Sequence, residues 1–400
     1  MRRAAAAAAA CVLIGLCFAS LAGCGGSPAP TVFKIGVVAE LTGSIPSVGE
    51  SCKNGATLAV NEINDAGGIG PATGRQLKVE LVVKDCENDP KRAAALTREL
   101  IDKDGVYAVV GPNATSNAVP AAAEAEKSGV VMVTPWSTSP KTTMDASGKP
   151  KKFVFRMCVT ASYEGERTAQ FAKEGLGAVK AAVLYDRTAD VLQTQADDFA
   201  RSFKRAGGTV VAFESFKGGD KDVTPQVTRI QKAAPDVLFV PAYYSDVPDL
   251  LQQVKTAGIA AQVIGSNGWS SPDVIDESGM AIESSFVFNM YSPQSTNQLT
   301  QHFVETYMAA YQGATPDDVA ALSYDAVGLV RKGFETTSML TSQIPEGLPK
   351  ALDESLLKVR EFSGVTGSMR FTAHSRDPVR GAVMLRVENG QFTLAATLPP

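Results

Sequence analysis

Short apolar runs alternate with amphipathic stretches along the first part of the chain, and this alternation restricts the folds that the sequence can adopt. We predict strands at 33–39, 77–85, 107–110 and 130–134, separated by helices at 50–66, 91–102 and 115–127. Strands that are linked through helices in this way form a parallel sheet with helices on both faces. The pattern therefore predicts a doubly wound α/β lobe.

The same alternation restarts after a polar loop at 139–152 and changes character near the C-terminus. We predict an extended segment at 153–157, strands at 181–185, 210–216, 237–241 and 262–265, and helices at 163–174, 190–206, 224–233 and 247–257. An extended segment at 286–290, two long helices at 296–312 and 316–336 and a β-rich end with an Asn389-Gly390 hairpin turn follow. We expect the helices to complete the first lobe and the hairpins to complete the second.

Two strand ends in the first lobe are followed by loops that are rich in hydroxyl groups. Thr115 and Ser116 follow one strand, and Trp136, Ser137 and Thr138 follow the next. Thr115 or Ser116 is expected to cap the intervening helix, whose free N–H groups and dipole favour an anion. Because ligands of α/β sheets bind at the carboxyl ends of the strands, the pattern predicts a site for a small anion such as a carboxylate. The alternative is a capped helix beside an ordinary loop.

The composition excludes several classes of function. The formal net charge is −4 and no basic cluster occurs beyond 149–152, which argues against nucleic acid as a partner. The two histidines, His302 and His374, are far apart in sequence, which argues against a histidine metal site or a catalytic triad. No hydrolase motif and no correctly placed glycine-rich loop is present. We therefore expect no catalytic residue, no metal and no cofactor, with a secreted hydrolase or a nucleotide-dependent oxidoreductase as the remote alternative.

The N-terminus has the features of a secretory signal. Arg2-Arg3 precedes an apolar run at 4–22, and Leu21-Ala22-Gly23-Cys24 resembles a bacterial lipobox. The resemblance implies a signal peptide at 1–23, cleavage before Cys24, lipidation of that cysteine and an extracytoplasmic protein anchored to a bacterial membrane. Residues 24–31 then form a flexible tether. An uncleaved anchor is the alternative, because the apolar run is almost long enough to span a bilayer.

Three cysteines remain in the mature domain. Cys52 lies near the start of the first helix and Cys86 just past the second strand, and in a right-handed βαβ unit these two ends lie at the same edge of the sheet. An oxidising compartment allows a disulfide to persist. We therefore predict a Cys52–Cys86 disulfide with Cys158 free, and three buried free thiols as the alternative.

Several short motifs occur in a fixed order from residue 34 to the C-terminal hairpin. They include Leu41-Thr-Gly, Gly111-Pro, Thr134-Pro, Pro241-Ala-Tyr-Tyr-Ser-Asp and Gly268-Trp. In their order and spacing the chain resembles lipoprotein substrate-binding components of ABC importers, in the branched-chain amino-acid (Leu/Ile/Val) binding family. The resemblance implies the periplasmic-binding-protein type I fold, with two Rossmann-like lobes joined by three crossovers. It places the N-terminal lobe at 32–156 plus 290–367 and the C-terminal lobe at 157–289 plus 368–400.

The resemblance also implies roles for individual residues. Thr115 and Thr138, with Ser116 and Ser137 beside them, fall where the family holds the α-carboxylate of the ligand. Trp136 falls where a backbone carbonyl meets the ammonium, and Tyr243 matches an aromatic residue that covers the ligand.

Three further positions bear on the ligand amine. Asn267 stands where the family typically has an acidic residue, and an amide brings no counter-charge for a buried ammonium. Asp190 is a candidate for the missing carboxylate, and Tyr163 is a candidate for the cleft wall. Alternatively, the ligand lacks an amine and is a small carboxylate, an amide or an aromatic acid.

These observations predict a non-enzymatic receptor that captures an amino acid or a related small polar solute between two closing lobes. Its partner is expected to be an ABC permease in the membrane. The alternative is a ligand-sensing lipoprotein that signals to a membrane partner, because the same fold serves both.

Overall fold

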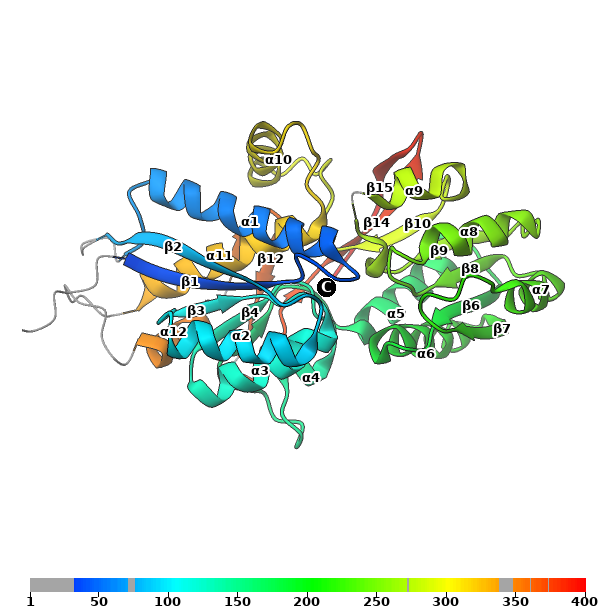
Figure 1. Ribbon diagram of the computed structural model, residues 1–400. Coiled ribbons are helices and arrows are strands. Elements are labelled where there is room, and N and C mark those ends of the chain that lie inside the picture. The colour runs from blue at the N-terminus through cyan, green and yellow to red at the C-terminus, as the bar shows by residue number, and fades with distance from the viewer. Residues whose placement is uncertain (1–31, 71–75, 272, 338–347, 360, 373) are drawn as a thin grey trace, which may run out of the picture.

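The computed structural model describes residues 32–70, 76–271, 273–337, 348–359, 361–372 and 374–400, and it consists of two α/β lobes side by side (Figure 1). The predicted signal peptide, tether and lipidated Cys24 lie outside the described residues. None of the described helices is both long and apolar enough to cross a membrane.

The first lobe is built on a five-stranded parallel sheet with the order β2-β1-β3-β4-β5. The strands are β1 (Val32–Ala39), β2 (Lys78–Asp85), β3 (Ala108–Val110), β4 (Val131–Thr134) and β5 (Val154–Arg156). Helices α1 (Pro46–Asp65) and α11 (Asp318–Thr336) cover one face, and α2 (Pro90–Asp102) and α3 (Thr115–Ser128) cover the other. Short helices α4 (Pro140–Thr143) and α12 (Leu348–Leu356) also belong to this lobe. Strands β3, β4 and β5 are fully buried and most of β1 is, which explains why they read as continuous apolar runs, whereas the edge strand β2 is partly exposed and carries charged residues.

The second lobe is built on a seven-stranded mixed sheet with the order β15-β14-β10-β9-β8-β6-β7. The strands are β6 (Lys180–Asp186), β7 (Thr209–Phe216), β8 (Val237–Val240), β9 (Gln262–Gly265), β10 (Phe286–Asn289), β14 (Ala382–Glu388) and β15 (Gln391–Leu398). The helices are α5 (Ala161–Gln170), α6 (Asp190–Arg205), α7 (Thr224–Ala233), α8 (Val247–Thr256) and α9 (Asp273–Ser278). Strands β14 and β15 join antiparallel through the predicted turn, where Asn389 and Gly390 both have positive φ.

The chain passes between the lobes three times. It leaves the first lobe after β5, returns after β10 to enter α10 (Gln298–Ala310), and leaves again through a small antiparallel sheet. That sheet consists of β11 (Phe362–Gly364), β12 (Gly367–Arg370) and β13 (Val379–Arg380). The α/β class predicted from the sequence is confirmed, as are the two Rossmann-like lobes joined by three crossovers.

Arg380, at the end of β13, connects the three crossovers. Its guanidinium is buried and donates to the backbone carbonyls of Met157 at 2.9 Å, Met290 at 2.9 Å and Thr366 at 2.7 Å. Each of these carbonyls belongs to a different passage of the chain. One side chain therefore fixes the three passages relative to one another.

Several predicted boundaries differ from the observed ones. Helix α1 begins at Pro46 rather than residue 50, because proline at the first helical position is compatible with a helix start. The helix predicted at 163–174 is α-helical only to Gln170 and continues as a π-helical turn at Phe171–Gly175. In the β-rich C-terminal part, β12 begins only at Gly367, because a tight turn at 365–366 joins it to β11.

The predicted Cys52–Cys86 disulfide is wrong. Both residues are fully buried free thiols, as is Cys158. Cys52 packs with Val37 in the core between the sheet and α1, whereas Cys86 packs with Val38 in the core on the opposite face. Successive residues of a strand face opposite sides of a sheet, so the sheet itself separates the two sulfurs. Burial raises the pKa of Cys52 to about 11 and that of Cys86 to about 12, so both are protonated at neutral pH.

Candidate functional site

The first wall of the site is the N-terminus of α3. The predicted cap by Thr115 or Ser116 is wrong, because Ala114 is the N-cap and offers no side-chain oxygen. The carboxylate of Glu40, at the end of β1, occupies that place: its Oε1 accepts from the N–H of Asn113 at 3.1 Å and of Ala114 at 3.0 Å. Part of the anion-binding capacity predicted here is therefore used by the protein's own carboxylate.

The loop after β4 forms the rest of this wall, and Arg156 supports it from inside the lobe. The fully buried guanidinium donates to the carbonyl oxygens of Ser137 at 2.7 Å and Ser139 at 2.6 Å. Thr138 lies between these two residues, and its hydroxyl has no hydrogen-bond partner within the part of the chain that the structure describes. The loop thus presents the Thr138 hydroxyl in a fixed position. Thr115 is joined to the same loop through a hydrogen bond of 3.1 Å to the Ser137 hydroxyl.

The facing wall comes from the second lobe, where Tyr243 and Asn267 follow β8 and β9. Burial raises the pKa of Tyr243 to about 12, and the carboxylates of Asp186 and Glu40 add to the effect, so its hydroxyl stays protonated at neutral pH. Asn267 is 4 % exposed, and its backbone N–H donates to Glu164 Oε1 at 2.7 Å. A carboxyl group therefore lies directly behind the position that lacks the acidic residue.

Between the two walls lies a cavity of about 10 Å³, which is roughly the space of one water molecule. Five of the nine predicted ligand-binding residues line it: Thr115, Trp136, Thr138, Tyr243 and Asn267. Asn113, Ala114, Val191, Leu192, Gln195 and Gly268 complete its lining. The structure thus brings strand ends of both lobes to one small enclosed space.

The other four predicted residues lie elsewhere. Ser137 is buried beneath the wall and bonds to Thr115 and Thr142. Ser116 lines a wider outer cleft of about 790 Å³ at the mouth of the site. Asp190 also lines this outer cleft, and its exposed carboxylate pairs with Lys141 of the other lobe at 2.8 Å.

Tyr163 does not line the inner cavity. Its hydroxyl donates to the carbonyl oxygen of Pro399 at 2.6 Å, and Arg167 stacks on its ring. The structure thus gives Tyr163 a contact with the C-terminal end of the chain.

Two residues of the site are absent from the sequence-based prediction. Gln195 on α6 lines the cavity, and its Nε2 donates to Glu164 Oε2 at 2.7 Å and to Asn267 Oδ1 at 3.0 Å. Glu164 is fully buried on α5, and burial raises its pKa to about 8. From the sequence alone, Glu164 would be interpreted as an exposed acidic residue in the first turn of a helix. Its burial depends on Gly165, where a Cβ would lie 2.5 Å from the Gln195 carbonyl and would push α5 away from α6.

The cavity wall contains two buried carbonyl oxygens without hydrogen-bond donors among the described residues. They are Asn113 Oδ1 and Gln195 Oε1. Both amides are oriented by their NH₂ groups: Asn113 Nδ2 donates to Glu40 at 2.9 Å, and Gln195 Nε2 donates to Glu164 and to Asn267 Oδ1. The two amide oxygens are therefore the groups left for a ligand. Buried acceptors without donors suit a ligand that carries N–H groups.

The comparisons with known proteins fit this geometry. The family model described as periplasmic binding protein matches residues 32–391. The chain belongs to the periplasmic binding protein family. This membership implies a location outside the cytoplasm, and the related proteins reported below are solute-binding proteins.

Individual members of the periplasmic binding protein family are similar to this chain over most of its length, in sequence and in structure. A leucine-, isoleucine-, valine-, threonine- and alanine-binding protein of Pseudomonas aeruginosa is 28% identical over 346 residues, which cover 86% of this chain and 87% of that protein. A branched-chain amino acid transporter substrate-binding protein of Streptococcus pneumoniae, solved with isoleucine, has a TM-score of 0.82 at 28% identity and covers 92% and 100% of the two chains. An ABC transporter substrate-binding protein of Desulfitobacterium hafniense in complex with Leu has a TM-score of 0.76 at 26% identity and covers 91% and 100%.

Proposed function

We propose that this protein is the extracytoplasmic receptor of an ABC importer, that it captures an amino acid between its two lobes, and that it delivers this ligand to a membrane permease. The observation that carries the proposal is the cavity between the lobes, in a chain of this family, to which both lobes contribute strand-end residues and which shares Thr115 and Tyr243 with the outer cleft. Lipidation of Cys24 would keep the receptor at the membrane. The two lobes, divided as the sequence predicts, would open and close around the crossovers.

The polarity of the cavity supports a zwitterionic ligand. Thr115 and Thr138 supply hydroxyl donors for a carboxylate, on the lobe whose helix N-terminus is electropositive. Gln195 and Asn267 supply oriented acceptors for an ammonium, and Glu164 behind them supplies the charge that Asn267 lacks. This arrangement supports an amine-bearing ligand over a purely anionic one.

Replacing Thr138 by alanine tests the carboxylate subsite. The hydroxyl has no hydrogen-bond partner among the described residues, so its removal should leave the melting temperature nearly unchanged. One lost hydrogen bond to a charged group is worth about 1.5–3 kcal/mol, so the amino-acid ligand should bind roughly tenfold or more weakly. The ligand is first found by a thermal-shift screen of the twenty amino acids and then titrated by calorimetry. Unchanged affinity in the variant would remove Thr138 from the site, and the absence of any stabilising amino acid would refute the proposal.

Replacing Glu164 by glutamine tests the amine subsite, because ligand binding there should release a proton from this carboxyl group. Because burial raises the pKa of Glu164 to about 8, its carboxyl is mostly protonated in the free protein at pH 7. An ammonium beside it lowers that pKa, so binding at pH 7 should release a proton, and the release should vanish above about pH 9, where the carboxyl is already ionised. Calorimetry at pH 7 in two buffers of different ionisation enthalpy measures the release.

The Glu164→Gln variant should show no proton release and an affinity reduced by roughly tenfold or more. Asp318→Asn is the comparison variant, because burial also raises the pKa of that carboxyl to about 7 although it does not line the cavity. The charge of Asp318 contributes to the raised pKa of Glu164, so this variant should reduce the proton release without abolishing it. Proton release that survives in Glu164→Gln but disappears in Asp318→Asn would contradict the assignment.

A further inference from the structure

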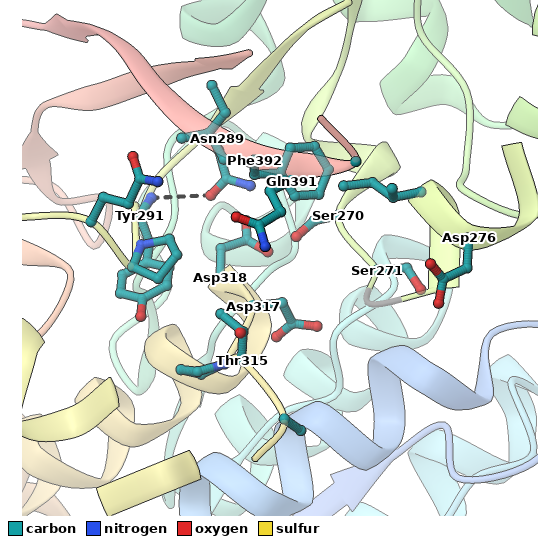
Figure 2. A pocket seen from close by; sticks show the side chains of 17 residues that line it. Ser270, Ser271, Asp276, Asn289, Tyr291, Thr315, Asp317, Asp318, Gln391 and Phe392 are labelled. Atoms are coloured by element: carbon teal, nitrogen blue, oxygen red, sulfur yellow. Dashed lines mark hydrogen bonds between the residues drawn. The ribbon is translucent and has the colours of Figure 1, made fainter. Parts of the chain in front are cut away.

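A second pocket lies on the other side of Trp136, where the two lobes meet beside the crossovers, and Figure 2 shows it from close by. Its volume is about 470 Å³, which is within the range of small-molecule sites. The N-terminus of α11 contributes Asp317 and Asp318 from the first lobe. Ser270 and Phe392 come from the second lobe, and Asn289 ends the strand before a crossover.

The charged residues that line this pocket are all acidic. Asp276, Asp317 and Asp318 line it, and none of the described residues in its lining is basic. Asp317 is satisfied within the protein: it caps α11 by accepting from the N–H of Ala320 at 2.8 Å, and it accepts from the Ser51 hydroxyl at 2.7 Å. Asp276 is exposed at the rim of the pocket, so Asp318 is the buried carboxyl group that is left as an acceptor.

Asp318 is 1 % exposed, and its Oδ1 has no hydrogen-bond partner among the described residues. Its Oδ2 accepts a long hydrogen bond, of 3.4 Å, from Trp136 Nε1, and the side chain of Ser270 also interacts with the carboxyl group and lowers its pKa. Figure 2 shows the carboxyl group facing the interior of the pocket, between Thr315 at one edge and Asn289 at the other. Burial first, and the neighbouring Asp317 second, raise the pKa of Asp318 to about 7. An unpaired buried carboxylate is costly, and a cation in the pocket would remove that cost.

The remaining lining suits an organic cation. Tyr291 and Phe392 offer aromatic surface, and Ile275 and Leu385 offer aliphatic surface. Aromatic rings beside a carboxylate bind alkylated ammonium groups through both charge and contact area. Arg380 acts on Asp318 from farther away and lowers its pKa, but it is held by backbone carbonyls and does not line the pocket.

We propose that this pocket is a second ligand site, separate from the inner cavity, that binds a small organic ammonium ion through Asp318. Because the lining comes from both lobes, a bound ammonium compound would connect them and would influence how they open. The inference goes beyond the proposed amino-acid site and does not depend on it.

The test compares n-butylamine, which is protonated at pH 7, with 1-butanol, its neutral isostere, in thermal-shift titrations of the mature protein. Sodium chloride keeps the ionic strength constant. The amine should raise the melting temperature in a saturable manner and the alcohol should not. Asp318→Asn should weaken the amine response by at least about tenfold in concentration.

Two control variants make the result specific. Asp276 lies in the same pocket but is exposed, so Asp276→Asn should retain the response. Thr138→Ala, in the inner cavity, should retain it as well. Equal responses to amine and alcohol, an undiminished response in Asp318→Asn, or equal losses in Asp276→Asn and Asp318→Asn would overturn the proposal. Loss of the amine response in Thr138→Ala would overturn the separateness of the two sites.

Discussion

Replacing Arg380 by methionine should lower the free energy of unfolding by about 3–5 kcal/mol. The side chain donates to three carbonyl oxygens from three different passages between the lobes; those of Met157 and Met290 are buried, and that of Thr366 is partly buried. Each buried acceptor left without a donor costs about 1–3 kcal/mol. Since the total stability of such proteins is about 5–15 kcal/mol, the loss should shift the midpoint of urea unfolding far beyond measurement error.

The lysine variant separates charge from geometry at this position. Arg380→Lys keeps a positive charge near Asp318 and Asp325 but cannot reach three separated acceptors with a planar fork. It should recover only part of the lost stability. A loss of less than about 1 kcal/mol in Arg380→Met would show that the crossovers hold together without this residue.

Replacing Arg156 by methionine should affect binding and stability together. This side chain is fully buried, pairs with Asp377 at 2.5 Å and fixes the carbonyls on either side of Thr138. Removing one member of a buried ion pair costs about 3–5 kcal/mol of stability. The freed loop would also no longer hold the Thr138 hydroxyl in position, so calorimetry on the folded variant should show an affinity reduced by at least roughly tenfold.

Arg376→Met is the matched control for Arg156→Met. Arg376 is also a buried arginine near the crossovers, and it pairs with Asp353 at 3.3 Å and donates to the carbonyl of Lys152. It does not touch the 137–139 loop. Its loss should lower stability without changing ligand affinity. Equal ligand affinities in the wild-type protein, Arg156→Met and Arg376→Met would show that Arg156 stabilises the fold but does not contribute to ligand binding.

The sequence was sufficient to predict the α/β lobes because their strands are buried on both faces and their helices carry one apolar side. Each of these patterns is local, as in the run at 35–39 or the spacing along α11. The disulfide prediction failed because proximity along one edge of a sheet does not specify the face, and the alternation of Val37 and Val38 shows that the two faces are distinct.

The candidate site was predicted where a residue follows a strand directly, as Thr115, Thr138 and Tyr243 do. It was missed where function depends on a contact between distant segments. Glu164 reads as an ordinary helical acid until α5 packs on α6, and Asp318 reads as a helix-start acid until its surroundings are known. Glu40 cannot be assigned to the α3 N-terminus from local pattern, because 73 residues separate it from Asn113.

The acceptors that Arg380 contacts are all main-chain oxygens, and this affects which amino-acid substitutions the crossovers can accept. A substitution at 157, 290 or 366 changes a side chain but leaves the carbonyl that receives the hydrogen bond. The hydrogen bonds of Arg380 therefore tolerate side-chain changes at these three positions, although packing in the core still limits the side chains at Met157 and Met290. Variation at the partly buried Thr366 can thus alter the packing of one crossover while Arg380 still links all three.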